Sequence, residues 1–211
     1  MPFDLAVIDL DNTLYAADSG VFSRMDKRMT EFVARELGID KATANAMRMR
    51  YWKQYGTTLR GLILHHGVDP EPFLFEVHDI RIEEFLQADA ELDHALEIIP
   101  GRKVIHTNGT KEHAKRVMRE LGVGHHFHAI YDIRFNDYLP KPCKKTLAML
   151  LAGEGVAPRR ALVVDDMPDN LAVAQELGSR TAWVSKSTKR NGWDYHATTL
   201  HHLPETIARS C

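Results

Sequence analysis

Residues 5–13 read LAVIDLDNT, an apolar run that ends in two acids two positions apart. Consecutive apolar residues before a polar turn predict a buried strand. Because side chains alternate along a strand with period two, Asp9 and Asp11 should point to the same side of the sheet. Two carboxylates at one strand end are unfavourable unless a cation or a phosphoryl group compensates them. This stretch therefore predicts a catalytic centre.

Later segments place further polar groups at predicted strand or loop ends. They are, in chain order, Thr107 and Asn108 after the apolar run 103–105, Lys141 between Pro140 and Pro142, and Asp165 and Asp166 after the run 161–164. The two prolines restrict the backbone on both sides of Lys141 and would hold its ammonium in place. Taken singly, each group has an ordinary explanation as a turn, a helix cap or a solvated lysine. Together and in this order, they are the groups that phosphoryl transfer needs.

This set of four motifs resembles the haloacid dehalogenase superfamily of phosphatases, over roughly residues 3–15 and 81–190. The resemblance implies that Asp9 is the nucleophile that attacks phosphorus and forms an aspartyl-phosphate. It implies that Asp11 protonates the leaving oxygen and later deprotonates the attacking water. Thr107 and Asn108 would hold the phosphoryl oxygens, and Lys141 would neutralise their charge.

The same resemblance implies a Mg²⁺ ion as cofactor. Its ligands would be Asp166, the Asp9 carboxylate and the main-chain carbonyl of Asp11, with Asp165 as the outer acid. The ion would orient the phosphate and reduce its repulsion from an anionic nucleophile. The fourth motif departs from the commoner form of the family, so three alternatives stay open for the outer group that supports the metal: Asp165, Asp169 and Asn170.

Asp11 separates branches of the superfamily. Dehalogenases and P-type ATPases lack an acid two residues after the nucleophile, so its presence favours a phosphatase or a phosphomutase. The substrate would be a small phosphorylated metabolite. The alternatives are a sugar-phosphate or other metabolite phosphatase, a phosphomutase, and a catalytically silent binding protein, although a binding protein has no need for Asp11.

Apolar runs alternate with helical patterns along the rest of the chain. The predicted strands are residues 5–10, 103–107, 129–133, 161–165 and 181–185, with a short strand near 197–200 and a small helix from Pro204. This alternation predicts an α/β fold, a doubly wound, mainly parallel, Rossmann-like sheet. Ligands of such sheets bind at the carboxyl ends of the strands, where all four motifs fall.

About ninety residues separate the first two motifs, far more than a crossover needs. Their pattern is helical and resembles the small all-helical cap of one phosphatase subgroup, which closes over the active site and selects the substrate. We place this cap at residues 15–80, with hinges at 14–17 and 78–81. The catalytic core would then comprise residues 1–14 and 81–211.

Residues 41–60 of the expected cap carry five basic residues and no acid. A charge run is usually a solvated face. Here the cations alternate with aromatic rings, which suits a planar, anionic ligand. Residues 55–62, YGTTLRGL, together with DLDNTLY at 9–15, resemble the pyrimidine 5'-nucleotidase subgroup, which removes phosphate from UMP and CMP. The sequence therefore predicts a nucleotide substrate, bound by Tyr51, Tyr55 and Arg60.

Composition and length limit the number of domains, the classes of binding partner and the cellular compartment that we expect. The 211 residues fit one domain with an insertion, and the 27 basic and 29 acidic residues give no reason to expect nucleic-acid or membrane binding. Cys143 and Cys211 are far apart and indicate free thiols in a reducing compartment. With no basic leader and no apolar run that could span a bilayer, we expect a cytoplasmic protein. The base, the physiological substrate and the oligomeric state stay open.

Paired histidines occur at 65–66, 125–126 and 201–202. Adjacent histidines do not share a helical or strand face, and no cysteine or acid accompanies them at ligand spacing in the sequence. We therefore do not expect a dedicated zinc site, although His65 or His66 would be close enough to touch a substrate in the cap.

Overall fold

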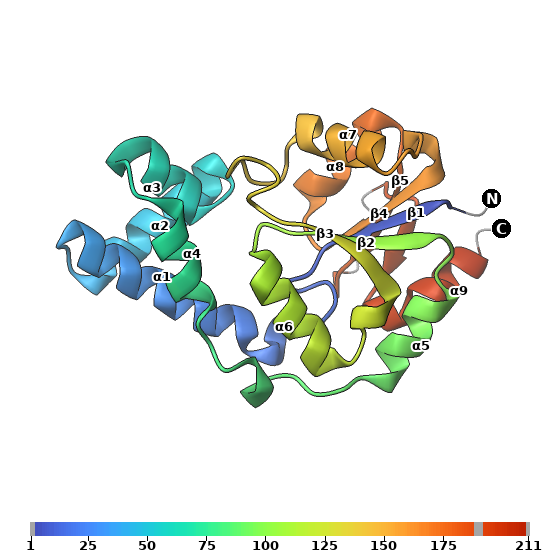
Figure 1. Cartoon of the computed structure of the whole chain (residues 1–211), viewed down its shortest axis with the longest axis horizontal. Coiled ribbons are helices and arrows are strands. Elements are labelled where there is room, and N and C mark those ends of the chain that lie inside the picture. The colour runs from blue at the N-terminus through green and yellow to red at the C-terminus, as the bar shows by residue number, and fades with distance from the viewer. Residues whose placement is uncertain (1–2, 188–191, 210–211) are drawn as a thin grey trace.

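One parallel sheet forms the centre of the computed structural model, which describes residues 3–187 and 192–209. The strands are β1 (Leu5–Ile8), β2 (Arg102–His106), β3 (Phe127–Tyr131), β4 (Ala161–Asp165), β5 (Arg180–Val184) and β6 (Tyr195–Ala197). Their order is β3-β2-β1-β4-β5-β6, and every neighbouring pair is parallel. The strand order reverses beside β1, and in such sheets ligands bind outside the carboxyl ends of the strands at this point (Figure 1).

Helices cover both faces of the sheet (Figure 1). One face carries α5 (Ala90–Ile98), α6 (Lys111–Leu121) and α9 (Leu203–Ala208), and the other carries α7 (Lys144–Gly153) and α8 (Pro168–Leu177). Leu5 and Val7 pack in the cluster that contains α7 and α8, whereas Ala6 and Ile8 pack in the opposite cluster. Successive side chains of β1 are therefore buried on opposite faces. The predicted doubly wound α/β fold is confirmed.

Strand boundaries differ from the prediction at the edges of the sheet. The strand predicted at 129–133 lies two residues earlier, because Asp132 starts a turn after β3. Its carboxylate accepts a hydrogen bond from the main-chain N–H of Arg134 at 3.2 Å, a local bond that favours a turn over a strand. At the other edge, the strand predicted at 197–200 is β6, which ends where that prediction began.

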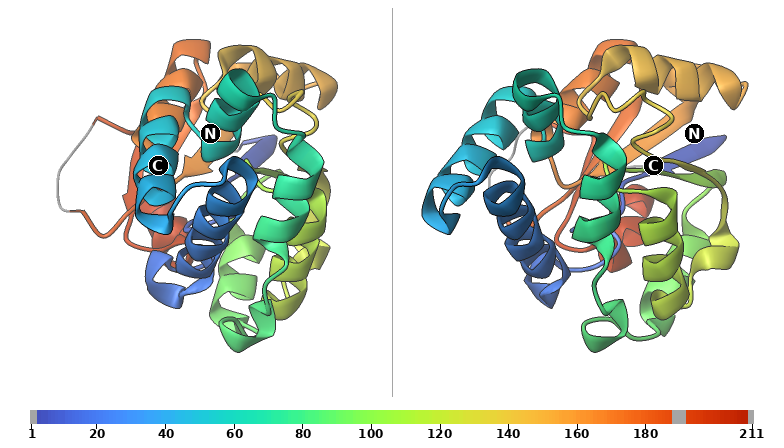
Figure 2. Two further views of the ribbon diagram at one scale, coloured as in Figure 1. Left: turned by 90° about the vertical axis from the view of Figure 1, so that its left-hand side faces the viewer. Right: turned by 60° about the vertical axis from the view of Figure 1, so that its left-hand side comes forward.

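The first four of the five α-helices between β1 and β2 form a helical insertion, residues 17–78, beside the sheet (Figures 1 and 2). The insertion contains η1 (Ala17–Ser19), α1 (Val21–Leu37), α2 (Lys41–Tyr55), α3 (Thr58–His66) and α4 (Pro70–His78). The side chains of Asp40, Thr57 and Asp69 accept main-chain N–H bonds at the starts of α2, α3 and α4. Phe32 and Phe73 pack edge to face with ring centroids 5.2 Å apart, so the insertion has aromatic packing of its own.

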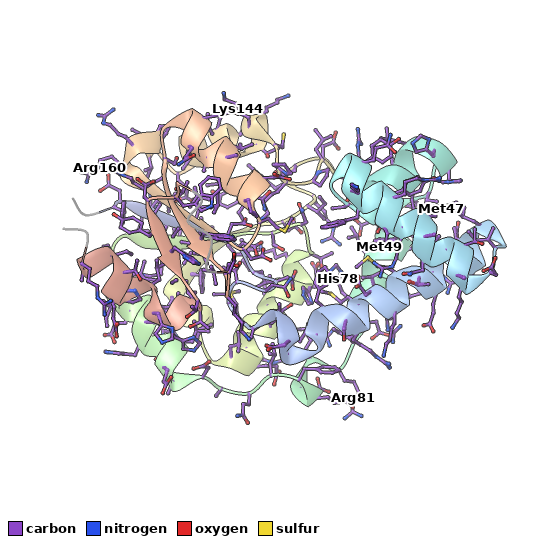
Figure 3. The ribbon with its side chains drawn as sticks, turned by 180° about the vertical axis from the view of Figure 1, so that it is seen from behind. Met47, Met49, His78, Arg81, Lys144 and Arg160 are labelled. Atoms are coloured by element: carbon purple, nitrogen blue, oxygen red, sulfur yellow. The ribbon has the colours of Figure 1, made fainter. Side chains whose placement is uncertain are left out.

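Charged and polar bonds tie the insertion to the core. Arg134 donates two hydrogen bonds of 2.8 Å to the carboxylate of Glu71 in α4. Arg116 of α6 donates to the main-chain carbonyls of His78 and Ile80, just where the chain leaves the insertion. Figure 3 labels His78 at the side of the insertion that is nearer the sheet. The insertion is thus held with one side toward the sheet.

Short 3-10 helices complete the description: η2 (Ile82–Glu84), η3 (Gly124–His126), η4 (Pro158–Arg160) and η5 (Leu200–His202). Cys143 is a free thiol, whereas Cys211 lies outside the described residues. Across residues 3–187 and 192–209, every helix is too short or too polar to cross a membrane.

Candidate active site

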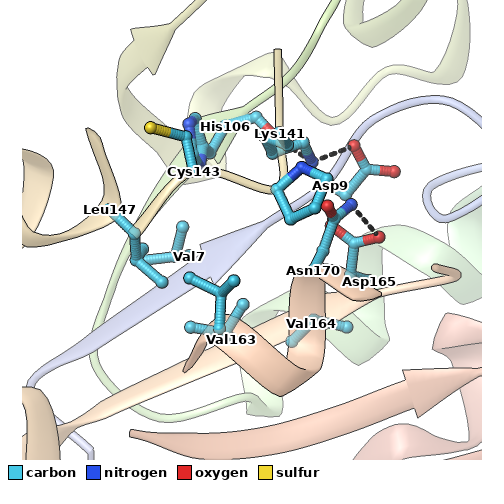
Figure 4. A pocket seen from close by; sticks show the side chains of 12 residues that line it. Val7, Asp9, His106, Lys141, Cys143, Leu147, Val163, Val164, Asp165 and Asn170 are labelled. Atoms are coloured by element: carbon cyan, nitrogen blue, oxygen red, sulfur yellow. Dashed lines mark hydrogen bonds and ion pairs between the residues drawn. The ribbon is translucent and has the colours of Figure 1, made fainter. Parts of the chain in front are cut away.

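Lys141 joins the carboxylates of two strand ends. Its Nζ lies 2.7 Å from Asp9 Oδ1, directly after β1, and 2.9 Å from Asp165 Oδ2, at the end of β4 (Figure 4). It also donates to the main-chain carbonyl of His106 at 2.8 Å, and all three charged side chains are buried. A single ammonium therefore links the ends of β1, β2 and β4.

The second motif positions this lysine through its backbone. Asn108 Oδ1 accepts a hydrogen bond from the main-chain N–H of Lys141 at 2.7 Å. Thr107 is fully buried, and its hydroxyl accepts the main-chain N–H of Gly109 at 2.9 Å. The structure thus brings Thr107 and Asn108 to the same strand ends as Lys141, as the order of parallel strands requires.

The turn after β1 wraps around Asp9. Asn12 has a φ of 65°, a left-handed conformation that asparagine tolerates better than most residues. The turn brings the Thr13 hydroxyl to 2.9 Å from Asp9 Oδ2, where it donates a hydrogen bond. With Lys141 on Oδ1 and Thr13 on Oδ2, both oxygens of the Asp9 carboxylate are held in a fixed orientation.

Asp11 occupies a different environment from Asp9. Its Oδ1 accepts hydrogen bonds from the Tyr15 hydroxyl at 2.5 Å and from His113 Nε2 at 2.9 Å. Burial favours the protonated acid, but the positive potential of His113 and the two hydrogen bonds outweigh this and lower the pKa of Asp11 below its ordinary value. Neither Tyr15 nor His113 was predicted as a site residue. His113 does carry a signal in the sequence, because it lies four residues before Val117 on the buried face of α6.

The acids around Lys141 carry more negative charge than it can balance. Burial raises the pKa of Asp9 well above its ordinary value, even though Lys141 opposes this. Burial and the nearby Asp165 raise the pKa of Asp166 to about 7. Burial disfavours the charged form of Lys141, but Asp165 and Asp9 outweigh it and raise its pKa. Added positive charge would stabilise this cluster in its ionised form.

The donor set fits a divalent cation such as Mg²⁺. Carboxylate oxygens of Asp9, Asp165 and Asp166 lie within 4.8 Å of one another, and oxygen donors are what Mg²⁺ prefers. Asp165 is already used by other partners, because Oδ1 accepts bonds from the Met167 N–H and the Asn170 amide at 2.9 and 2.8 Å. This arrangement suits an outer role for Asp165 and Asn170, whereas Asp166 has its carboxylate available.

A cavity of about 330 Å³ opens above these acids, between the sheet and the insertion. The core lines it with Asp9, Asp11, Lys141 and Asp166. On the insertion side the lining is mostly apolar and includes Phe22, Met25, Met29, Met49, Trp52 and Phe73. The charged residues among its insertion lining are Arg48 and Asp26, whose Nη1 and Oδ1 atoms lie 2.8 Å apart. The core side of the cavity, its floor, is therefore charged, whereas the insertion side, its roof, is apolar apart from the Arg48–Asp26 ion pair.

Tyr51, Tyr55 and Arg60 are not among the residues that line this cavity. Tyr51 is 5% exposed and packs against Gly61, and its hydroxyl lies 2.8 Å from His66 Nε2. The Tyr55 hydroxyl lies 2.6 Å from His65 Nε2. The two tyrosines therefore belong to the contact between α2 and α3, and the structure does not bring them together with the acids.

A neighbouring stripe of α2 reaches the cavity. Arg48 and Trp52 are four residues apart and both line it, whereas Tyr51, three residues after Arg48, is turned by about 60° around the helix and packs on α3. Arg48 is held by Asp26 and by Thr30, whose hydroxyl accepts from Nε at 3.0 Å. The basic and aromatic composition of α2 marked the helix, but not which of its residues line the cavity.

The histidine pairs contact side chains that are not among the residues lining the cavity. His125 and His126 each place Nε2 near Asp93 Oδ1, at 3.1 and 2.7 Å, so an acid distant in sequence does accompany this pair. His126 and Asp93 thereby join η3 to α5. His78, expected only as part of a hinge, lines the cavity and packs against His113 with ring centroids 4.6 Å apart.

Known proteins resemble this chain in sequence and in fold. The haloacid dehalogenase-like hydrolase family model matches residues 3–178. A curated relative, Phosphate metabolism protein 8 of Saccharomyces cerevisiae, is 25% identical over 185 residues, which cover 81% of this chain and 58% of the yeast protein. The chain therefore spans little more than half the length of that relative.

Solved structures share the fold at low sequence identity. A HAD phosphatase from Thermococcus onnurineus is 20% identical over 97% of both chains, with a TM-score of 0.65. A 2-haloacid dehalogenase from Pseudomonas syringae is 21% identical over 99% of this chain and 100% of that one, with a TM-score of 0.62. Since the family match covers most of the chain and the strand ends carry its four motifs, the chain belongs to the haloacid dehalogenase-like hydrolase family.

Proposed function

We propose that this hydrolase is a Mg²⁺-dependent phosphomonoesterase that acts through an aspartyl-phosphate. The observation that carries the proposal is the pair of acids after β1, one held by Lys141 and the other by Tyr15 and His113. The two carboxylates lie in different environments, so one can serve as nucleophile while the other transfers protons.

Each half of the reaction uses both acids. In the first half, a carboxylate oxygen of Asp9 forms a bond to phosphorus, the bond from phosphorus to the leaving oxygen breaks, and Asp11 gives that oxygen a proton. In the second half, Asp11 takes a proton from water, the water oxygen bonds to phosphorus, and the Asp9–phosphorus bond breaks. Inorganic phosphate leaves, and both acids return to their starting state.

Asp11 distinguishes this chemistry from dehalogenation. A halide leaves as a stable anion and needs no proton, whereas an alkoxide leaving group does. An acid fixed by two hydrogen bonds beside the nucleophile therefore supports a phosphatase, although dehalogenases share the fold.

The acidic cluster supports a metal requirement. Asp9 and Asp166 would hold Mg²⁺ with the Asp11 main-chain carbonyl, and Asp165 would support them. When bound, the ion supplies positive charge that draws the phosphate toward an anionic nucleophile. Lys141 and Asn108 keep the remaining side of the site in place through the contacts described above.

The insertion is proposed to act as a substrate-selecting cap over residues 15–80, with the core formed by 1–14 and 81–211. A pyrimidine nucleoside monophosphate is the proposed substrate. The Trp52 ring offers a face for a base, and the Arg48–Asp26 pair offers a donor beside an acceptor, which matches the mixed donor and acceptor edge of uracil or cytosine. We assign this role to Arg48 and Trp52 because they line the cavity.

A phosphate-release panel tests the proposal. UMP and CMP should be hydrolysed in Mg²⁺ and not in EDTA, faster than sugar phosphates, and 2-chloropropionate should release no chloride. Asp9→Asn serves as the inactive control. No hydrolysis of any phosphomonoester would refute the phosphatase assignment, whereas a preference for sugar phosphates would refute only the nucleotide assignment.

A matched pair of variants tests which face of α2 contacts the substrate. Trp52→Ala should raise KM for UMP at least several-fold and leave turnover of p-nitrophenyl phosphate nearly unchanged, because that small substrate barely reaches the roof of the cavity. Tyr55→Ala, which alters the same helix away from the cavity, should change both substrates little. If Tyr55→Ala raised KM for UMP and Trp52→Ala did not, substrate binding would be assigned to the tyrosines instead.

A further inference from the structure

The geometry points to Tyr15 and His113 as positioning residues that dedicate one oxygen of Asp11 to proton transfer. Both donate to the same atom, Oδ1, at 2.5 and 2.9 Å. Within the described residues no hydrogen bond reaches the second oxygen, Oδ2. Asp11 lines the cavity, and its side chain is 15% exposed. Oδ2 is therefore the atom that gives and takes the proton, an inference that rests on the proposed phosphatase reaction.

His113 is placed for this task by the start of α6. The Thr110 hydroxyl accepts the His113 main-chain N–H at 3.2 Å, which fixes the first turn of the helix directly after the Thr107-Asn108-Gly109 motif. The His113 side chain has 0% exposure, so its ring cannot turn toward solvent. Its position is thus set by the same strand end that carries the second motif.

The hydrogen bonding of His113 fixes its tautomer. Oδ1 of Asp11 accepts whether or not Oδ2 carries a proton, so Nε2 must donate to it and, in the neutral ring, Nδ1 must carry the lone pair. Nδ1 is buried without a hydrogen-bond partner among the described residues. A buried nitrogen without a hydrogen-bond partner is unfavourable, so an apolar side chain would pack better at this position. The contact with Asp11 accounts for the presence of a histidine.

His78 keeps the His113 ring in place from the side of the insertion. The two rings lie 4.6 Å apart at an angle of 31°. His78 Nδ1 lies 2.7 Å from the main-chain carbonyl of Leu74, so its ring is fixed by its own helix. Arg116, on the same helix as His113, bonds the main-chain carbonyl of His78. The support of Asp11 is therefore built from the core and from the end of the insertion together.

Leaving-group dependence separates positioning from simple packing. His113→Leu should slow phospho-enzyme formation from UMP by a factor within the roughly 10²- to 10⁴-fold range of a general acid. It should slow 2,4-dinitrophenyl phosphate far less, because that leaving group needs no proton. KM for both should stay near wild type. His113→Gln, which can still donate from its amide to Oδ1, should recover at least tenfold of the UMP loss.

A double variant shows whether His113 acts through Asp11. If it does, His113→Leu combined with Asp11→Asn should be no slower with UMP than Asp11→Asn alone. Tyr15→Phe removes only a hydroxyl and repeats the test if His113→Leu fails to fold. His126→Leu, which contacts Asp93 away from the site, is the control and should behave as wild type.

Equal losses for both leaving groups, or additive losses in the double variant, would overturn the positioning role. A wild-type enzyme that releases no phosphate, or an Asp11→Asn variant with normal rates, would instead refute the proposed function itself.

Discussion

Asp166→Asn is expected to stabilise the metal-free protein at alkaline pH. A pKa of about 7 in place of the ordinary 3.8 means that the folded protein holds a proton on Asp166 more tightly than the unfolded chain does. This stability is present below about pH 4 and is lost as the pH rises through about 7. Three pH units at about 1.36 kcal/mol each give an upper limit of about 4 kcal/mol. Because Asp166 is partly exposed, about 1–2 kcal/mol is expected.

Thermal and urea unfolding in EDTA at pH 5 and pH 8 measure the effect. At pH 8 the variant should exceed wild type by about 2–8 °C in Tm, the shift expected for a chain of this size, and at pH 5 the difference should be less than about half as large. Excess Mg²⁺ should stabilise wild type more than the variant, because an ion that binds only the folded state adds to its stability. Asp169→Asn, at an exposed position in the same motif, is the control and should change neither curve. Wild type and Asp166→Asn with the same pH dependence in EDTA would refute the reasoning.

Three further substitutions test the packing and charge of the site. Asp9→Asn should abolish phosphate release while its Tm in EDTA at pH 8 stays at or above wild type, since burial raises the pKa of Asp9; more than a few per cent activity would remove it as nucleophile. Lys141→Met should cost about 3–5 kcal/mol in urea unfolding, because it leaves Asp9 and Asp165 buried without their cation; a loss below 1 kcal/mol would contradict the ion pairs. Gly61→Ala should cost about 1–3 kcal/mol with kcat unchanged, because a Cβ there would lie 2.2 Å from Tyr51 Cγ; an unaffected Tm would contradict this packing.

The chemical half of the site could be predicted because parallel strands bring their carboxyl ends to one edge. Asp9, Lys141 and Asp165 lie up to 156 residues apart in sequence, from 9 to 165. Even so, Asp9 and Asp165 each follow an apolar run, and Lys141 lies between two prolines. Because β1 pairs in parallel with both β2 and β4, the residues that follow these strands lie at the same edge of the sheet. Local pattern and topology together determine these contacts.

The insertion side of the cavity could not be predicted in the same way. Composition marked α2 as basic and aromatic, but Arg48 faces the cavity and Tyr51 faces α3, a difference of three positions on one helix. Which face turns inward depends on how α2 packs against α1 and α3, and no period in the α2 sequence encodes it. His113 escaped notice for a related reason, since a histidine on a buried helical face usually belongs to the core.

The distribution of charge around the cavity gives the two parts of the chain different tasks. The titratable groups next to Asp9 are contributed by the core, and Lys141 forms ion pairs with two of them that reduce their mutual repulsion. The insertion, by contrast, faces the cavity with apolar side chains and with Arg48 and Asp26, which neutralise each other. Changes to the insertion lining can therefore alter which ligand the cavity accepts without altering the charge next to Asp9. Changes at Asp9 or Lys141 alter that charge directly, and loss of Lys141 also removes the ion pairs that link the ends of β1 and β4.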